Sequence, residues 1–123
     1  MNNPPSKEEL ITSIIKFLED DVIHELKGQK RFHAHVAKNS LSVILREIQL
    51  EESNNKSEKE RLEKILKTND SIKKMNKLLC QNIDNEQIDI SDNHLIDHLF
   101  KTTMEKLSID QPSYSSFLAE KEK

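Results

Sequence analysis

Apolar residues recur at intervals of three and four along most of this chain, which is the spacing of an amphipathic helix. The first such face comprises Leu10, Ile11, Ile14, Ile15, Leu18, Val22 and Leu26. Ser6 and Glu9 form a capping-box pattern just before this face, and Gly28 is a natural stop after it. The pattern predicts a first helix from about Ser6 to Gly28.

The next run, from Arg31 to Ile48, has apolar residues on two sides. One side comprises Phe32, Val36 and Val43, and the other comprises Ala34, Ala37, Leu41, Ile44, Leu45 and Ile48. A helix that is apolar on two sides is usually covered from two directions. We therefore expect a second helix from about Gln29 to Leu50, central in the fold and antiparallel to the first.

Polar residues 51–56 predict a loop after this helix, with Asn55 or Ser57 capping the next one. A further helical stripe comprises Leu62, Ile65, Leu66, Ile72, Met75, Leu79 and Ile83. Residues 68–70 interrupt it, which predicts either one bent helix or two short helices with Asp70 as a second cap.

The C-terminal third predicts one more main helix. Residues 88–90 form a short extended connection, Ser91 is the expected N-cap, and Ile90 with Leu95 fits a hydrophobic staple. The expected inward face comprises Leu95, Ile96, Leu99, Phe100, Thr103 and Leu107. Beyond Pro112, we expect the tail to dock onto the bundle through Tyr114, Phe117 and Leu118.

Composition supports an all-helical reading of these stripes. The 123 residues include one Gly and three Pro, so the residues that tight turns and hairpins need are scarce. This length suits one hydrophobic core and is too short for two. We expect an all-α, single-domain bundle of four or five helices over residues 1–123, with residues 1–5 and 119–123 flexible.

Charge and cysteine content narrow the functional classes. The formal net charge is -3, so there is no overall positive field to attract nucleic acid or an anionic membrane. No apolar run approaches the ~20 residues of a membrane span, and the N-terminus lacks a secretory signal pattern. The single Cys80 cannot form an internal disulfide. We expect a cytoplasmic protein without nucleic-acid or membrane partners.

A row of polar residues accompanies the second helix. His33, Ser40 and Glu47 follow one another at steps of seven residues, or about 10 Å at 1.5 Å per residue. They therefore cannot form a catalytic triad among themselves. One interpretation is a buried polar seam that fixes the helix register.

The other interpretation is a binding groove on this side of the helix. An Arg in the first helical turn opposes the helix dipole, so Arg31 calls for an acidic partner such as Asp21 or Asp110. The candidate ligand- or partner-binding residues are Arg31, His33, Asn39, Asp110 and Tyr114.

His94, Asp97 and His98 follow the spacing of the HxxEH motif of zinc enzymes, with Asp in place of the catalytic Glu. The shorter Asp side chain misplaces the base, and no downstream Glu ligand motif is evident. We interpret the two histidines as an exposed pair and expect neither a metal nor a catalytic residue.

Three stretches carry a resemblance to a known family. They are PPSKEELITSIIKFLEDDV, RFHAHVAKNSLSVILREI and MEKLSIDQPSY. They resemble the bacterial family of domain of unknown function 6285 (DUF6285), while residues 51–93 match it by helical pattern more than by motif. The motif positions present are Arg31, Phe32, His33, Asn39, Lys106, Asp110, Pro112 and Tyr114. His35 and Lys38 depart from the small or Arg-like residues that are more usual there.

The resemblance implies small helical proteins of no established activity, often encoded beside acyl-CoA dehydrogenases and phosphotransferases similar to aminoglycoside or choline kinases. Because the sequence shows no catalytic constellation, we expect a non-catalytic accessory or regulatory subunit that binds one of these enzymes and needs no cofactor. The alternative is a small helical enzyme or ligand-binding protein that uses the five candidate residues. Self-association through a stripe of Ile72, Met75 and Leu79 is compatible with both.

Overall fold

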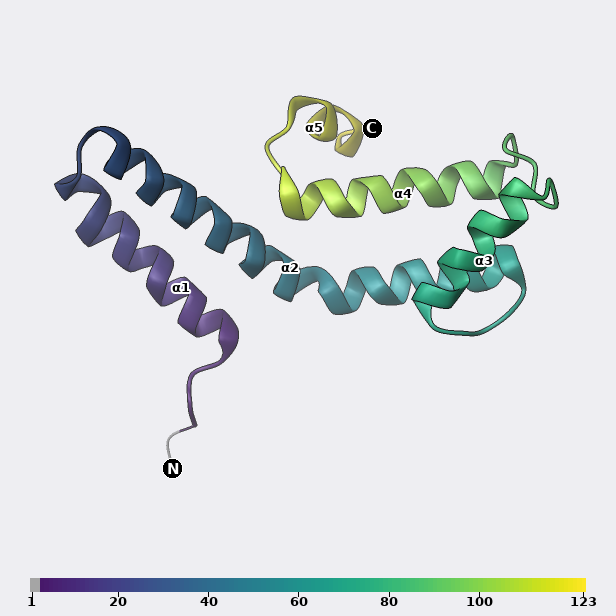
Figure 1. Cartoon of the computed structure of the whole chain (residues 1–123), viewed down its shortest axis with the longest axis horizontal. Helices are drawn as coiled ribbons and strands as arrows, with labels where there is room; N and C mark the ends of the chain where they lie inside the picture. Colours follow the sequence, from purple (N-terminus) through teal and green to yellow (C-terminus); the bar gives the residue numbers. More distant parts are fainter. Residues whose placement is uncertain (1–2) are drawn as a thin grey trace. The chain divides into compact units, whose positions relative to one another are not determined.

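A computed structural model describes residues 3–123, and these residues form helices and connecting turns without a strand (Figure 1). The helices in chain order are α1 (Lys7–Phe17), a π-helical turn (Leu18–Val22), a 3-10 turn (Ile23–Glu25), α2 (Gly28–Leu66), α3 (Ile72–Asp84), α4 (Asn93–Asp110) and α5 (Ser115–Lys121). The predicted all-α fold of four or five helices is confirmed: the described residues form five α-helices, and α2, of 39 residues, is the longest of them. Within residues 3–123, no helix combines the length and the apolar character that crossing a bilayer requires.

The contacts within the chain divide it after Leu50 into two compact units. We call them the N-terminal unit, up to Leu50, and the C-terminal unit, from Glu51 onward. Helix α2 is central in the sense that it contributes to both. The predicted flexibility of residues 1–5 falls partly on residues 1 and 2, which lie outside the described residues; at the other end, residues 119–121 belong to α5.

The N-terminal unit is a hairpin of α1 and the first part of α2 (Figure 1). The predicted capping box at its start is confirmed, because the Glu9 N–H donates to Ser6 Oγ at 3.1 Å and the Ser6 N–H donates to Glu9 Oε1 at 3.4 Å. Regular helix ends at Phe17, earlier than predicted. Three acidic residues follow at 19–21, where the negative end of the helix dipole disfavours them. Gly28, at φ +61, then reverses the chain.

One predicted side of α2 is not covered. Ala34 is buried, but Phe32 is 63% exposed and Val36 is 45% exposed. Among residues 3–50, α1 is the only other α-helix, and one neighbouring helix covers one side of α2. The expectation that this stretch is packed from two directions is therefore wrong for the Phe32 side.

Helix α2 runs without a break through residues 51–56, where the sequence predicted a loop capped at Asn55 or Ser57. This prediction is wrong because polarity alone does not end a helix. The segment holds neither Gly nor Pro, and Asn and Ser cost only a few tenths of a kcal/mol each relative to better helix formers. In addition, Glu52 and Lys56 have the i,i+4 spacing that supports a helix.

The predicted interruption at residues 68–70 is confirmed. Helix α2 ends at Leu66, and Lys67 adopts a left-handed conformation with φ 54. The cap of α3 is Ser71, whose Oγ accepts from the Lys74 N–H at 3.2 Å. Asp70 was the predicted cap, but its carboxylate instead accepts from the Ser71 N–H at 2.7 Å.

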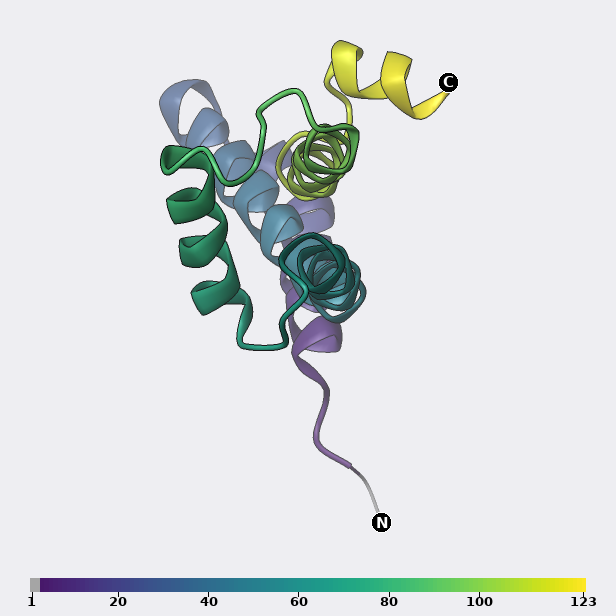
Figure 2. The ribbon, with the colours of Figure 1, turned by 90° about the vertical axis from the view of Figure 1, so that its right-hand side faces the viewer.

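The core of the C-terminal unit lies between the last part of α2, α3 and α4, which Figure 2 shows side by side. Its buried side chains are Leu62, Met75, Leu79 and Leu95, with Ile65, Leu66, Ile72, Ile83 and Ile88 packed against them. These are mainly the residues of the predicted stripe, which is therefore confirmed. Since Met75 and Leu79 are only 1% and 4% exposed, they offer no surface for self-association, and that proposed contact is wrong.

Helix α4 begins one residue later than predicted and presents a different face to the core. Asp92 is the cap, and its Oδ1 accepts from the N–H groups of His94 and Leu95 at 2.8 and 3.1 Å. Ile90 is 75% exposed, so the predicted staple to Leu95 is absent. The inward-face prediction is right for Leu95 and wrong for the exposed side chains Ile96, Leu99 and Phe100.

The C-terminal tail returns to the bundle as α5, which contacts α4. Phe117 is buried, as predicted for a docked tail. Tyr114 and Leu118 remain 49% and 42% exposed, so only one of the three expected anchors is fully used.

Candidate functional site

The face of α4 that was not predicted to point inward carries a polar cluster centred on Arg61 of α2. The Arg61 guanidinium forms an ion pair with Glu105 at 2.6 Å and donates to Ser57 Oγ at 2.7 Å and Thr102 Oγ1 at 3.1 Å. Its Nε–H donates to His98 Nδ1 at 3.0 Å. We call these five residues the Arg61 cluster.

Helical spacing explains how the cluster assembles. His98, Thr102 and Glu105 stand at i, i+4 and i+7 on α4, so they share one face, and Ser57 and Arg61 stand at i and i+4 on α2. The side chains of Arg61 and Glu105 are 12% and 21% exposed, so both charges are largely removed from water. A buried pair of this kind is stable only when the remaining donors and acceptors also find partners, as they do here.

The protonation state of His98 follows from its contacts. The ring is 2% exposed, and its Nδ1 accepts a hydrogen bond, so the proton of the neutral imidazole is on Nε2. Burial lowers the pKa of His98, and the positive charge of Arg61 lowers it further. His98 is therefore a neutral side chain whose Nε2–H is a donor.

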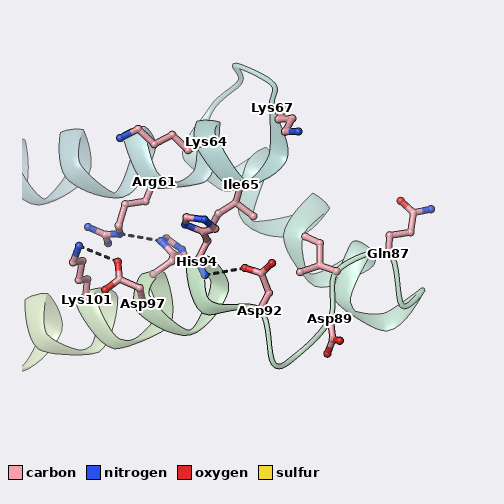
Figure 3. Close-up of a pocket in the computed structure, with 12 residues that line it drawn as sticks. Arg61, Lys64, Ile65, Lys67, Gln87, Asp89, Asp92, His94, Asp97 and Lys101 are labelled. Carbon is pink, nitrogen blue, oxygen red and sulfur yellow. Dashed lines mark hydrogen bonds and ion pairs between the residues drawn. The ribbon is translucent and has the colours of Figure 1, made fainter.

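A cavity of ≈640 Å³ adjoins the cluster within the C-terminal unit. Figure 3 shows that its polar walls come from both helices, with Arg61 and Lys64 on α2 and His94, Asp97 and Lys101 on α4. The complete lining is Arg61, Lys64, Ile65, Lys67, Gln87, Ile88, Asp89, Asp92, His94, Asp97, His98 and Lys101.

The three acidic residues of this cavity all have partners. Asp89 accepts from the backbone N–H and the hydroxyl of Ser91 at 2.9 and 2.8 Å, and these two bonds lower its pKa. Asp92 caps α4, and Asp97 pairs with Lys101 at 2.9 Å. Each of the three carboxylates therefore has a local hydrogen-bond or ion-pair partner, although Asp89 and Asp92 keep their negative charges.

The five sequence-predicted site residues lie elsewhere. Arg31, His33 and Asn39 are exposed on α2 in the N-terminal unit, where the rings of Phe32 and His33 meet edge-on at 5.8 Å between centroids. Asp110 ends α4 and Tyr114 precedes α5, both exposed in the C-terminal unit. None of the five lines the cavity. Their role in binding stays a prediction.

The polar row of the second helix is not a buried seam. His33, Ser40 and Glu47 are all exposed, and the Ser40 hydroxyl donates to the Val36 carbonyl of its own helix at 2.9 Å. The interpretation as a buried seam is therefore wrong at these positions. A buried polar seam does exist, but it is the Arg61 cluster.

The paired histidines of α4 also differ from expectation. His94 is exposed, as predicted, but His98 is buried and bonded to Arg61. Across residues 3–123, no three His, Cys, Asp or Glu side chains are arranged to hold a metal ion.

Sequence reasoning missed Arg61, Ser57, Thr102 and Glu105. The available signal was the i, i+4, i+7 row of polar residues on α4, which lies opposite a short Ser-Arg pair on α2. The strong apolar row Ile96, Leu99 and Phe100 on the same helix obscured it, because apolar residues are the default candidates for a buried face.

A second feature is the apolar surface of the N-terminal hairpin. Leu10, Ile14 and Phe17 on α1 are 50%, 46% and 55% exposed, and Ile44 on α2 is 44% exposed. The residue that follows each of them in the sequence is half-buried; these residues are Ile11, Ile15, Leu18 and Leu45. Because the two helices are antiparallel, the residue that precedes an inward-facing residue points to the same side of the hairpin on both of them. We call these four residues the hairpin face.

An ion pair shows which residues of α1 and α2 lie opposite each other along the hairpin. Lys38 Nζ lies 3.7 Å from Glu19 Oε1. Ile14 is five residues before Glu19 and Ile44 is six residues after Lys38, so the two isoleucines are nearly level in an antiparallel pair. The hairpin face is therefore continuous across both helices.

Comparison with known proteins identifies one family. The family model described as "Domain of unknown function (DUF6285)" matches residues 24–114. The match takes in all of α2, α3 and α4 and leaves out α1 and α5. No curated protein and no solved structure matches the chain. Since the matched residues make up more than half of the sequence, the chain belongs to the DUF6285 family.

Proposed function

We propose that this chain is a non-catalytic accessory subunit that binds another protein through the hairpin face. The observation that carries the proposal is the exposure of Leu10, Ile14, Phe17 and Ile44 on one side of α1 and α2. Together their exposed fractions equal about two complete large apolar side chains, or roughly 300–500 Å² of surface. This size is comparable to the largest apolar patch of a typical monomeric protein, and such a patch is often functional.

Charge at one end of the hairpin face defines the partner further. Residues 17–26 contain four acidic side chains and no Lys or Arg, and Asp20 and Asp21 are exposed just beyond Phe17. A complementary surface has an apolar groove with a basic edge. The family resemblance suggests two partners, a phosphotransferase similar to aminoglycoside or choline kinases and an acyl-CoA dehydrogenase.

Co-purification with each of these two enzymes from the same genome tests the proposal. We expect a stoichiometric complex with one of them, and Ile14→Ser is expected to weaken it at least about tenfold, which is the effect of truncating a hot-spot residue near the centre of an interface. The matched control is Ile96→Ser, because Ile96 is similarly exposed but lies on α4.

Three results would count against the proposal. The first is a chain that stays alone at micromolar concentrations with both enzymes. The second is an equal loss of binding in both variants, since the hairpin face would then have no special role. The third is a dimer in light scattering that Ile14→Ser dissociates, because the hairpin face would then join two copies of this chain.

A further inference from the structure

The cavity beside the Arg61 cluster is lined by a histidine with one ring N–H that has no protein partner among residues 3–123. His98 is 2% exposed, its Nδ1 is occupied by Arg61, and Nε2–H has no partner among the described residues. Within those residues, no side-chain nitrogen or oxygen is both fully buried and unpartnered. The Nε2 atom of His98 is therefore not fully shielded, and His98 is one of the residues that line the cavity.

The surroundings of this donor are also rich in N–H groups. Arg61, Lys64, His94 and Lys101 line the same cavity. Lys64 has no ion-pair partner among residues 3–123, and the Lys101–Asp97 pair is more than half exposed and therefore weak. Asp89 and Asp92 keep their negative charges but accept from Ser91 and from the N-terminus of α4, and Asp97 is matched only by the weak pair with Lys101. The donors of the cavity that have no partner among the described residues are His98 Nε2–H and Lys64 Nζ.

We propose that this cavity binds a small organic oxyanion, with its carboxylate or phosphate group accepting from His98 Nε2–H and lying between Lys64 and Lys101. Hydrogen bonds from charged or polarised donors to an oxyanion are the strong ones. Ile65 and Ile88 supply apolar wall for the carbon part of the ligand, and ≈640 Å³ falls within the usual range for a small-molecule site. The site lies in the C-terminal unit and the hairpin face in the N-terminal unit, so neither proposal depends on the other.

The test follows the His98 ring directly by NMR. Full-length protein with labelled histidine is titrated with inorganic phosphate and, separately, with acetate, at constant ionic strength adjusted with chloride. We expect the His98 Nε2 and ring resonances to move in a saturable way with at least one of the two anions. Whichever anion saturates at the lower concentration identifies whether a phosphate or a carboxylate is preferred.

Two variants locate the binding. Lys64→Gln removes one flanking charge at an exposed position and is expected to weaken binding about five- to tenfold. Lys73→Gln on α3 removes the same charge outside the cavity lining and should leave the affinity unchanged. Neither position belongs to the Arg61 cluster, so both variants should keep the fold.

Three outcomes would overturn this assignment. The His98 resonances could fail to move with either anion. The same change could appear with chloride alone, which would indicate screening. Lys64→Gln and Lys73→Gln could weaken the response equally, which would indicate a diffuse effect of net charge.

Discussion

Removal of Arg61 is the sharpest test of how the C-terminal unit is held together. In Arg61→Ala, Glu105 loses its ion-pair partner and His98, Ser57 and Thr102 each lose a donor. Breaking a buried ion pair from one side costs about 3–5 kcal/mol. Because Glu105 is 21% exposed and recovers some hydration, we place the cost at the lower end, about 3 kcal/mol.

That cost is large against the roughly 5–15 kcal/mol that stabilises a protein of this kind. It corresponds to a fall in Tm of about 12 °C for a chain of this length. The assay is urea denaturation followed by circular dichroism for Arg61→Ala, Glu105→Ala and the double variant. We expect the two single changes to be non-additive, with a coupling energy of about 1–3 kcal/mol.

The matched control is Lys64→Ala, one helical turn away on α2 and exposed. A surface change of this kind should stay within about 0.5 kcal/mol of the parent protein. The reasoning fails if Arg61→Ala is no more destabilising than Lys64→Ala, or if the effects of Arg61→Ala and Glu105→Ala simply add.

Three further predictions concern titration, helix continuity and the core. The pKa of His98 is lowered in the folded state, so below about pH 6.5 the unfolded chain binds a proton more readily than the folded chain does. The contribution of His98 to the free energy of unfolding is therefore full above about pH 6.5 and is lost as the pH falls below it. Denaturation midpoints measured from pH 8 to 5 should show this slope, and His98→Gln should flatten it whatever its own stability. Asn55→Pro should break α2 at a cost of about 3 kcal/mol while Asn55→Ala leaves helicity unchanged or higher by circular dichroism; equal helicity in both would indicate that residues 51–56 are a loop. Leu62→Ala, at a side chain with 0% exposure, should lower the free energy of unfolding by about 3–5 kcal/mol, whereas Leu99→Ala, at 49% exposure, should cost far less; similar losses would contradict the exposure of Leu99 on α4.

Predictions were correct where a single short-range interaction determines the local structure. The capping box of Ser6 and Glu9, the reversal at Gly28 and the break after Leu66 each depend on a few neighbouring residues. The apolar stripe through Leu62, Met75 and Leu79 was also readable, because its period is that of one helix face.

Predictions were wrong where two local alternatives compete and the sequence pattern does not decide between them. Ser91 and Asp92 are both good caps; in the structure Asp92 caps α4, and the Ser91 hydroxyl donates to Asp89. The polar residues 51–56 resemble a loop, yet they stay helical because nothing in them breaks the backbone pattern.

The sequence alone determined the all-α class, a count of four or five helices and the family, because helical periodicity, scarce Gly and Pro, and motif spacing are all properties of the linear chain. Only the tertiary structure decided which face of α4 is buried. Both faces of that helix have the right period, and the choice depends on Arg61, 37 residues away from His98, whose guanidinium satisfies the polar face and leaves Ile96, Leu99 and Phe100 exposed. A long-range partner of this kind cannot be read from local spacing, and Arg61 also lines the cavity that we propose for an oxyanion.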